Sequence, residues 1–582
     1  MKEKATTLAV QRLVIVLAVL AVLGQIASHE FVGFDDPNTI YRNPRFNPPT
    51  VDNILYYWSH DEGLLYIPVT YTAWGLVATV ARVESPDVTG SSQNPWLFHA
   101  LNVLLHLGTA LLVFEWLRVI LRVNWPACVG ALVFALHPLQ VETVAWASGT
   151  KDLLCGFFVT ATLWAYLTAR NDESSPRSHK GMYALATACY VLGMLSKPTA
   201  MVTPALAVVM DRWVLGRSWK QIGRSPWPWV WFALAIPCMV IATRVQPGEA
   251  LDPIPLWIRP LIAADSLAFY LWKLVWPASL AVEYGHKPSW VLEQGWAYWT
   301  WILPVAVGIA LWITRKRSPL LLAGGMMVAI ALSPVLGLTP FHFQVFTTVA
   351  DHYMYIPMLG VSLAGGSVVA RHESKTVLIV AGLVLAALGV RSFAAARVWN
   401  DNISLFTNAL EVNPRSWLAA DDLGTACVLR ARAAGSVDEV IRWLEKAEDA
   451  YRQMVAIDRS HSRGTRKLVK TLSESAAFLG NAQRDDEAIA KCREFISITD
   501  GARAARMNLT GPAMAAGVRR VHGGALLRRG RISEAIEQFR VAVSLRPNDP
   551  AARKDLEVAL EALNRPTTRP TPEPPTQPSK RD

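Results

Sequence analysis

Long apolar runs separated by short polar segments fill the chain up to about residue 396. A run of about 20 mostly apolar residues is long enough for a helix to cross a bilayer. Pro or Gly interrupts several runs, which membranes tolerate where neighbouring helices satisfy the freed backbone groups. One further run, 259–282, is ambiguous. We therefore predict a polytopic bundle of membrane helices, with candidate spans at 9–27, 96–120, 125–141, 152–169, 181–196, 198–214, 228–243, 298–314, 319–338, 353–370 and 376–394.

Clusters of Lys and Arg follow alternate apolar runs, and such clusters mark the cytoplasmic side of a membrane. All clusters fall on one side if 259–282 does not cross the membrane, or crosses it as a tight hairpin, and the number of spans is then 11 or 13. A single crossing there would break the rule. We therefore expect an odd number, with the C-terminal region outside the cytoplasm. The clusters are Lys2, Lys4 and Arg12; Arg118 and Arg122; Arg170, Arg177 and Lys180; Arg212, Arg217, Lys220 and Arg224; Arg315, Lys316 and Arg317; and Arg371 with Lys375.

Composition changes sharply near residue 396. Of 23 Trp residues, only Trp399, Trp417 and Trp443 lie beyond that point, where Arg, Glu, Ala and Asp become frequent. This step predicts a membrane domain, 1–395, followed by a soluble one. The net charge of +11 would raise the question of nucleic acid. Many of the cations, however, sit in short loops between apolar runs, where they determine topology, so nucleic acid is not an expected partner.

The N-terminal run fits either a cleaved signal peptide or a retained first helix. Its length and the many spans that follow favour the retained helix. The chain is therefore expected to be an integral, multi-pass membrane protein with membrane lipids as its surroundings.

A repeat pattern appears in the C-terminal part. Within 516–549, small residues, an aromatic residue and Pro recur at the spacing of a 34-residue tetratricopeptide repeat, in which small residues let two helices pack closely. Degenerate copies precede it, so we predict an α-solenoid of three to four units over 396–563, with 550–563 as a capping helix. The Pro- and Thr-rich tail, 564–582, is expected to be disordered. The diagnostic residues are Gly523, Gly530, Ala535, Phe539, Ala542 and Pro547.

Polar residues that could carry chemistry gather in the segments predicted to lie outside the cytoplasm. Asp35 and Asp36 follow the first run and precede a Pro. They fit an Asx-type turn or a general base held at the membrane surface. His99, Asn102 and His106 share one face of the second span. For Asn102 and His106 we favour interhelical hydrogen bonds.

Further motifs follow in order along the chain. The whole set is Asp35-Asp36, His99-x-x-Asn102-x-x-x-His106, His137-Pro with Glu142, Lys151-Asp152, Lys197 between two spans, and Asp351-His352-Tyr353-Met-Tyr355-Ile-Pro357. This ordered set, followed by the repeats, resembles the transmembrane and tetratricopeptide repeat-containing (O-mannosyltransferase-like) family of GT-C fold glycosyltransferases. The chain departs from that family's pattern at Pro198, where relatives often have an acid, and at Asp351-His352, where Glu-Arg is usual.

The resemblance implies an all-α, GT-C-like membrane domain ahead of the solenoid. It also implies transfer of a sugar, mannose or another hexose, from a polyprenyl- or dolichyl-phosphate donor to Ser or Thr hydroxyls of extracytoplasmic proteins. By its match to the first-loop motif, Asp35 is the candidate base, which would favour inversion at the sugar carbon. Asp36 would orient Asp35 or the acceptor. The donor and its phosphate would be bound by Lys197, Lys151, Arg244, His352, Asp351, His99, Glu142 and Asp152.

Metal dependence stays open. The outer carboxylates could bind a divalent cation, but no ligand spacing fixes such a site, and no other cofactor is expected.

Two alternative functions stay open as well. The first is a transferase that acts on a lipid or envelope glycan with the same base. The second is a non-catalytic membrane scaffold that presents the repeats to partners. The solenoid itself fits either a generic scaffold or a concave groove that binds an acceptor protein's extended chain. A transporter would predict pseudo-symmetric halves and polar residues near the middle of the membrane, and the sequence has neither pattern.

Overall fold

The computed structural model describes residues 2–62, 65–86, 90–171, 176–245, 254–372, 374–457, 462–500 and 507–564. It divides into two compact units, Met1–Asp422 and Leu423–Asp582, called here the membrane unit and the C-terminal unit. No strand occurs among the described residues, which confirms the predicted all-α class. The predicted tail lies outside the described residues, apart from Asn564.

The membrane unit consists of long helices joined by short ones. The α-helices are α1 (Lys2–Leu23), α2 (Val51–Tyr56), α3 (Pro68–Ala81), α4 (Pro95–Leu121), α5 (Asn124–Leu136), α6 (Val141–Ala145), α7 (Thr150–Asn171), α8 (Pro176–Ser196), α9 (Thr203–Val209), α10 (Trp219–Gly223), α11 (Pro226–Val245), α12 (Arg259–Val275), α13 (Pro288–Glu293), α14 (Ala297–Thr300), α15 (Ile302–Thr314), α16 (Pro319–Leu332), α17 (Met358–Arg371), α18 (Lys375–Val398) and α19 (Asn402–Val412). The division between the units falls inside α20 (Trp417–Ala433).

Short 3₁₀ and π turns connect these helices, and several of the polar residues named above lie in or next to them. They are η1 (Gly24–Ser28), η2 (Pro37–Tyr41), η3 (Pro138–Gln140), η4 (Ala147–Gly149), η5 (Pro198–Val202), η6 (Met210–Val214), η7 (Ser333–Val335), η8 (His342–Val345) and η9 (Asp351–Met354).

Six helices among the described residues are long and apolar enough to cross a membrane, and the bent pair Asn124–Leu136 and Pro138–Ala145 would make a seventh. Two shorter apolar helices, Pro319–Val335 and Met358–Arg371, accompany them. The helix bundle is therefore confirmed, whereas the number of 11 or 13 spans stays a prediction. The spans differ in the share of their apolar stretch that is buried inside the protein. This share is 72% in Ala147–Asn171 and 6% in Ala297–Thr314. Helix α7 thus lies at the centre of the bundle.

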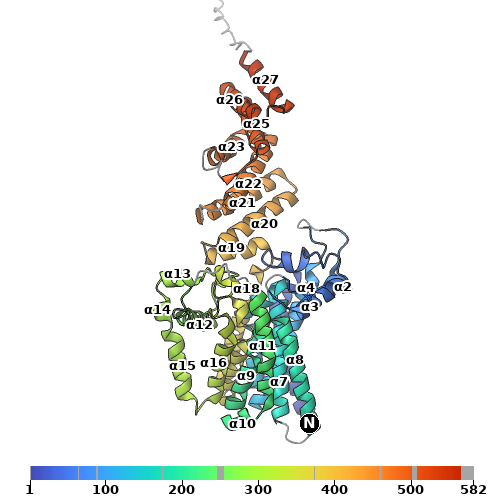
Figure 1. Ribbon diagram of the computed structural model, residues 1–582, viewed down its shortest axis with the longest axis vertical. Helices are drawn as coiled ribbons and strands as arrows, with labels where there is room; N and C mark the ends of the chain where they lie inside the picture. Colours follow the sequence, from blue (N-terminus) through green and yellow to red (C-terminus); the bar gives the residue numbers. More distant parts are fainter. Residues whose placement is uncertain are drawn as a thin grey trace, which may run out of the picture. The chain divides into compact units, whose positions relative to one another are not determined.

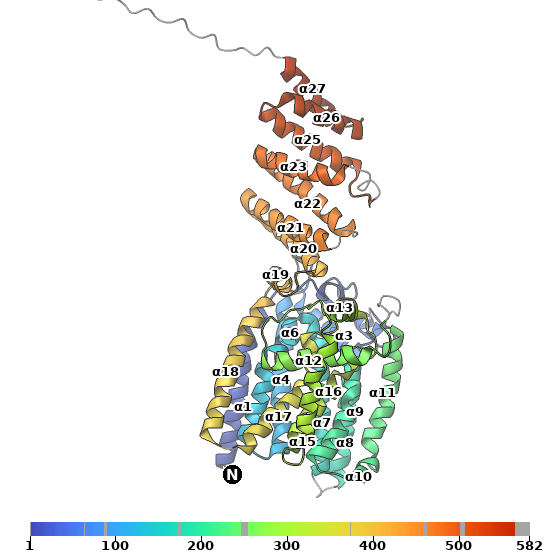
Figure 2. The same cartoon turned by 90° about the vertical axis from the view of Figure 1, so that its left-hand side faces the viewer.

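Helix α12 decides how the ambiguous run 259–282 is arranged. It runs across the direction of the long helices (Figure 2) and is not among the six long apolar helices. Tyr270 fixes it to the chain ahead of η9, because its hydroxyl donates to the Ala350 carbonyl at 3.2 Å and accepts from the Ala350 amide at 3.0 Å. Trp272 and Val275 are exposed. This geometry agrees with the alternative in which 259–282 does not cross.

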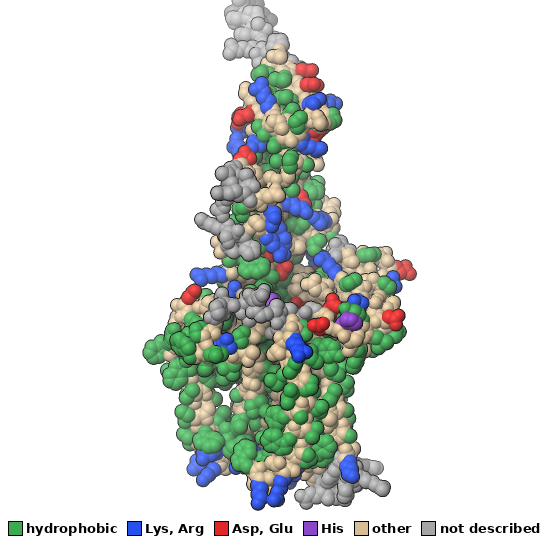
Figure 3. Space-filling view, viewed as in Figure 1, with side chains coloured by type: hydrophobic (Ala, Val, Ile, Leu, Met, Phe, Trp, Pro, Cys, Tyr) green, Lys and Arg blue, Asp and Glu red, His purple; other side chains and the backbone are tan. Residues whose placement is uncertain are grey.

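Lys and Arg side chains gather at one end of the membrane unit, below a belt of hydrophobic side chains (Figure 3). The turn between α15 and α16, with Arg315, Lys316 and Arg317, lies at this end, as does α10 with Lys220 (Figure 1). The predicted clusters at these two turns therefore share one end of the bundle.

The C-terminal unit is a row of antiparallel helices, each packed against the next, as expected for helical repeats (Figure 1). Glycine lets neighbouring helices pack closely, which the repeat pattern predicts for Gly523. A Cβ at Gly523 would lie 2.7 Å from the Phe539 ring, and one at Gly424 would lie 2.4 Å from the Tyr451 ring. Beyond α20, the helices are α21 (Val437–Ile457), α22 (Ser462–Asn481), α23 (Asp485–Thr499), α25 (Pro512–Arg528), α26 (Ile532–Leu545) and α27 (Pro550–Asn564).

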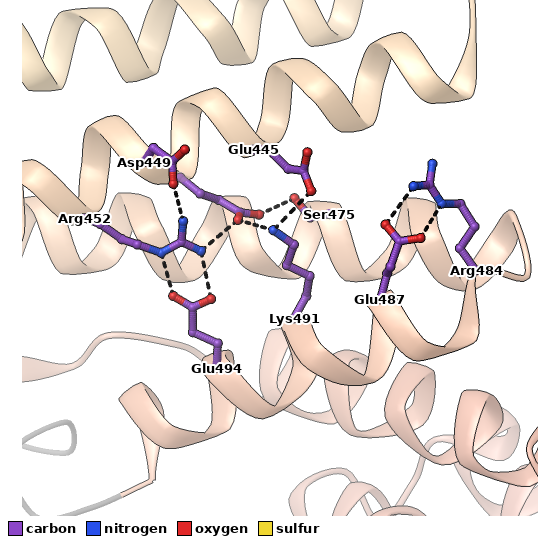
Figure 4. Close-up of polar contacts among 9 residues, drawn as sticks. Glu445, Asp449, Arg452, Ser475, Arg484, Glu487, Lys491 and Glu494 are labelled. Carbon is purple, nitrogen blue, oxygen red and sulfur yellow. Dashed lines mark hydrogen bonds and ion pairs between the residues drawn. The ribbon is translucent and has the colours of Figure 1, made fainter.

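A buried carboxylate joins three of these helices (Figure 4). Glu448 on α21 is fully buried and accepts hydrogen bonds from Ser475 on α22 at 2.6 Å and from Lys491 on α23 at 2.5 Å. Arg452 donates to Glu448 at 3.0 Å and binds both oxygens of Glu494 at 2.8 Å. A buried charge is tolerated only when it is paired in this way.

Candidate active site

Asp36 is a fully buried carboxylate at the start of η2. Its Oδ1 accepts from the Ser148 amide at 2.9 Å and from the Ser148 hydroxyl at 2.5 Å, and its Oδ2 accepts from the Val32 amide at 3.0 Å. Burial raises the pKa of Asp36 to about 6, although these hydrogen bonds act in the opposite direction. Because both oxygens are occupied, Asp36 fixes the first loop against η4.

Asp35 differs from its neighbour in exposure. Its side chain is 44% exposed, and its Oδ2 lies 3.2 Å from the Nζ of Lys151. Lys151 is buried at the start of α7, and its Nζ lies 4.4 Å from the centre of the Trp146 ring. The local turn is closed by the Asp35 backbone carbonyl, which accepts from the amides of Asn38 and Thr39 at 3.0 Å. The Asp35 carboxylate therefore stays accessible to a ligand.

A second ion pair between a lysine and a carboxylate lies beside the pair of Lys151 and Asp35. The Nζ of Lys197, between α8 and η5, is 2.5 Å from Oδ1 of Asp152, and both residues are buried. Asp152 follows Lys151 directly in α7. The other oxygen of Asp152 is buried and has no hydrogen-bond partner among the described residues. Buried polar atoms are nearly always partnered in folded proteins, so this oxygen is a candidate contact for a bound ligand.

The last motif forms the third part of the site. Nδ1 of His352 lies 2.6 Å from Oε1 of Glu142, and the Asp351 amide donates to Oε2 of the same carboxylate at 3.1 Å. Asp351 in turn accepts from the Tyr284 hydroxyl at 2.8 Å. Burial raises the pKa of Asp351 to about 7. The helices α6 and η9 are thereby fixed to each other.

Three rings connect these pairs into one cluster. The Trp146 ring lies 5.7 Å from the His352 ring, and the His352 ring lies 4.4 Å from the Tyr353 ring. Nζ of Lys197 lies 5.7 Å from the Tyr353 ring. The structure therefore gathers the following predicted residues into one cluster: Asp35, Asp36, Glu142, Lys151, Asp152, Lys197, Asp351 and His352.

Two predicted site residues lie apart from this cluster. Nε2 of His99 lies 3.3 Å from the Glu30 carbonyl, and its ring lies 6.1 Å from the His29 ring. Arg244 is exposed at the end of α11 and has no side-chain contact to the cluster among the described residues.

The two other residues of the polar face of α4, Asn102 and His106, make hydrogen bonds to other segments, in line with the expected structural role. Asn102 donates to the Trp146 carbonyl at 2.7 Å and accepts from the Thr150 hydroxyl at 2.6 Å. His106 contacts the Tyr355 hydroxyl at 3.1 Å and the Ala135 carbonyl at 3.0 Å. Asn102 therefore positions η4 and the start of α7, where Lys151 and Asp152 lie.

Parts of the chain are similar in sequence to known proteins. Residues 88–243 match the family described as Dolichyl-phosphate-mannose-protein mannosyltransferase. Human Protein O-mannosyl-transferase TMTC2 is 24% identical over 184 residues, which are 32% of this chain and 22% of that protein. Human Protein O-mannosyl-transferase TMTC4 is 23% identical over 444 residues, 66% of this chain and 59% of that protein. Protein O-mannosyl-transferase Tmtc3 of Drosophila melanogaster is 22% identical over 436 residues, 61% of this chain and 46% of that protein.

The resemblance inferred from the sequence is confirmed. The chain spans less than two thirds of the length of each of these O-mannosyltransferase relatives. The matched family region contains Glu142, Lys151, Asp152 and Lys197, whereas Asp35 lies ahead of it.

Sequence reasoning missed Ser148 and Tyr284. Ser148 binds Asp36 across 112 residues of chain, and Tyr284 binds Asp351 from the loop after α12. Neither residue has a distinctive spacing, so only the packing of distant segments identifies it.

The sequence alone does not decide whether the site binds a metal ion. The described residues hold no group of three or more His, Cys, Asp or Glu side chains arranged to bind a metal ion.

Proposed function

We propose that this chain is a membrane glycosyltransferase that moves mannose or another hexose from a polyprenyl- or dolichyl-phosphate donor to Ser or Thr hydroxyls of proteins outside the cytoplasm. The observation that carries the proposal is the half-exposed Asp35 carboxylate beside the buried cations Lys151 and Lys197. The similarity to proteins named as O-mannosyltransferases supports the class of reaction and a protein acceptor.

Asp35 acts as the base in this mechanism. Its carboxylate takes the proton of the acceptor hydroxyl as that oxygen forms a bond to the anomeric carbon of the sugar. The bond between that carbon and the phosphate oxygen breaks in the same step, so the configuration at the sugar carbon is inverted. Asp36 does not take the proton, because its oxygens are bound by Ser148 and Val32. It holds the loop that carries Asp35.

Lys197 and Lys151 stabilise the departing lipid phosphate. Negative charge develops on that phosphate as its bond to the sugar breaks, and fixed cations in a site with little water favour such a transition state. His352, held by Glu142, offers its second ring nitrogen as a further polar contact. The free Oδ2 of Asp152 is suited to accept a hydrogen bond from a sugar hydroxyl.

The repeats serve the same acceptor in this proposal. If the C-terminal unit lies outside the cytoplasm, its helices and the Asp35 loop share one compartment. A solenoid of helical repeats offers an extended binding surface, which suits an acceptor polypeptide.

Replacing Asp35 by Asn tests the base directly. We expect transfer from polyprenyl-phosphate mannose to a Ser/Thr peptide to fall by about 100-fold or more, because general-base catalysis contributes about 10²–10⁴-fold. The measurement is radiolabel transfer by the purified full chain in lipid vesicles. Asp61→Asn, at an exposed position of the same outer segment, should retain activity.

Three other outcomes would change the proposal. Full activity of the Asp35→Asn chain would remove Asp35 from the mechanism. Label recovered only in lipid extracts would favour a glycan or lipid acceptor. No transfer by the unaltered chain from a panel of polyprenyl-phosphate sugars would favour a scaffold.

A further inference from the structure

A cavity of about 440 Å³ opens in the membrane unit beside the candidate active site. It lies between the segment that leads from the end of α12 into α13 and the segment that joins α19 to α20. Aromatic rings and two cations account for much of its wall. These residues are Tyr284, Trp290, Phe346, Trp417, Lys287 and Arg415.

Its wall is held in a defined shape. Glu283 is buried, and both of its oxygens accept from Nδ2 of Asn413, at 3.1 and 3.0 Å. Gly285 has a φ of +63°, and a Cβ there would lie 2.5 Å from the same Asn413 nitrogen. Only glycine adopts this conformation readily and leaves that space. The Glu283–Asn413 contact therefore fixes the two walls to each other.

The charge available to a ligand in this cavity is positive. The Glu283 carboxylate is already bound by Asn413, although it also attracts Lys287 at longer range. Among the described residues, no carboxylate lies within ion-pair distance of Lys287 or of the exposed Arg415. Lys287 also lines a neighbouring cavity of about 180 Å³ that includes Arg259. Aromatic walls with unpaired cations suit an anionic group attached to an apolar or aromatic one.

A row of rings connects the cavity to the Asp35 loop. The Phe34 ring lies 6.1 Å from the Phe343 ring, that ring lies 5.9 Å from the Phe346 ring, and the Phe346 ring lies 6.1 Å from the Trp417 ring. Phe34 directly precedes Asp35. An extended chain advances about 3.3–3.6 Å per residue, so about five or six residues of a polypeptide cover this row.

We propose that the cavity binds a segment of the acceptor polypeptide in which an acidic side chain adjoins an aromatic or large apolar one, about five or six residues from the hydroxyl that receives the sugar. The inference rests on the proposed function and adds a sequence preference for the acceptor. Lys287 and Arg415 bind the acidic group, and the rings of Trp290, Phe346 and Trp417 cover its neighbour.

Paired peptides test the inference. Each carries one Ser and, six residues away, either Glu-Phe or Lys-Phe. We expect the full chain in lipid vesicles to glycosylate the Glu peptide with a KM about tenfold lower, because a charge-assisted hydrogen bond is worth that much or more. The double variant Lys287→Glu/Arg415→Glu should lose or reverse this preference, while kcat and the KM for the lipid donor stay unchanged.

Two further variants and a binding measurement complete the design. Lys287→Gln/Arg415→Gln should remove the preference without reversing it. Arg82→Glu, an exposed charge reversal at the end of α3, should keep it. Anisotropy of a labelled Glu peptide reads out binding even without turnover and should show the same order of affinities.

Equal KM values for the two peptides in the unaltered chain would overturn the inference while leaving the proposed function standing. A rise in the KM for the lipid donor alone in the double variant would also overturn it, because the cavity would then bind a lipid phosphate. Absence of transfer to both peptides would overturn the proposed function and this inference with it.

Discussion

Asp35 and Asp36 are adjacent in the chain, but their surroundings give them different chemistry. Asp36 is fully buried and accepts three hydrogen bonds, whereas Asp35 is half-exposed and paired with one lysine. A carboxylate whose two oxygens both accept hydrogen bonds from the protein is held rigidly. One with an open side can bind a substrate hydroxyl. In the proposed mechanism, this two-residue motif supplies both the support and the reactive group.

The buried Asp36 should make stability depend on pH in an unusual direction. Its pKa is about 6 in the folded chain and about 3.9 in an unfolded one. Between these values the unfolded chain loses its proton while the folded chain keeps it. Folding stability should therefore fall as pH rises from about 4 to about 6, by roughly 3 kcal/mol at most, and stay lower above pH 6.

The variant Asp36→Asn isolates this effect. An amide cannot ionise, so the difference in apparent Tm between pH 4 and pH 6 should shrink relative to the unaltered chain, measured in detergent. The variant should be less stable overall at low pH, because its amide nitrogen cannot accept from the Val32 amide. Asp61→Asn serves as the exposed control. An unchanged pH slope in Asp36→Asn would contradict the assignment.

At the scale of elements, the helices α21, α22 and α23 depend on one carboxylate. Glu448→Ala would leave Lys491 and Ser475 without their buried partner. Breaking a buried ion pair costs about 3–5 kcal/mol, so we expect faster hydrogen–deuterium exchange across these three helices in the full chain. Glu445→Ala is the matched control, since Glu445 is 48% exposed and lies 3.8 Å from Lys491. Equal exchange in the two variants would show that the network is not needed for stability.

The sequence predicts elements well where one physical signal dominates. The apolar runs predicted the long helices, and the small residues Gly523 and Ala535 predicted the closely packed repeat. The number of spans could not be obtained in the same way, because an apolar helix can be buried by lipid or by protein. Helix α12 shows the difference. Its run is apolar, yet Asp265 and Lys273 are buried within it, and it lies across the direction of the long helices.

At the scale of the whole molecule, the candidate site is assembled from segments far apart in the chain. The first loop, the α6–α7 region, the α8–η5 joint and η9 each contribute a charged residue. The order of these motifs indicated that they belong together, because the resemblance to a family depends on order. The pairings themselves, such as Lys151 with Asp35 and Lys197 with Asp152, arise only from packing. Pattern alone could therefore name the residues but not their partners.

The predicted topology places the C-terminal unit outside the cytoplasm, and two Asn-x-Ser/Thr sequons offer a test of it. Asn508 is exposed, whereas the Asn402 side chain accepts from the Gly33 amide and contacts the Phe31 carbonyl. N-glycosylation requires an accessible Asn in a lumenal segment. Expressed in a cell with an endoplasmic reticulum, the chain should gain one N-glycan, measured as a mass increase that glycosidase removes.

Two substitutions assign that glycan. Asn508→Gln should abolish the mass increase, and Asn402→Gln should leave it unchanged. The C-terminal unit should also resist protease added outside sealed microsomes. The two results together would place the repeats in the lumen, and an odd number of spans then puts the Asp35 loop in the same compartment. An unmodified chain whose repeats are digested from the cytoplasmic side would require an even number, and the repeats could not then present an acceptor to Asp35.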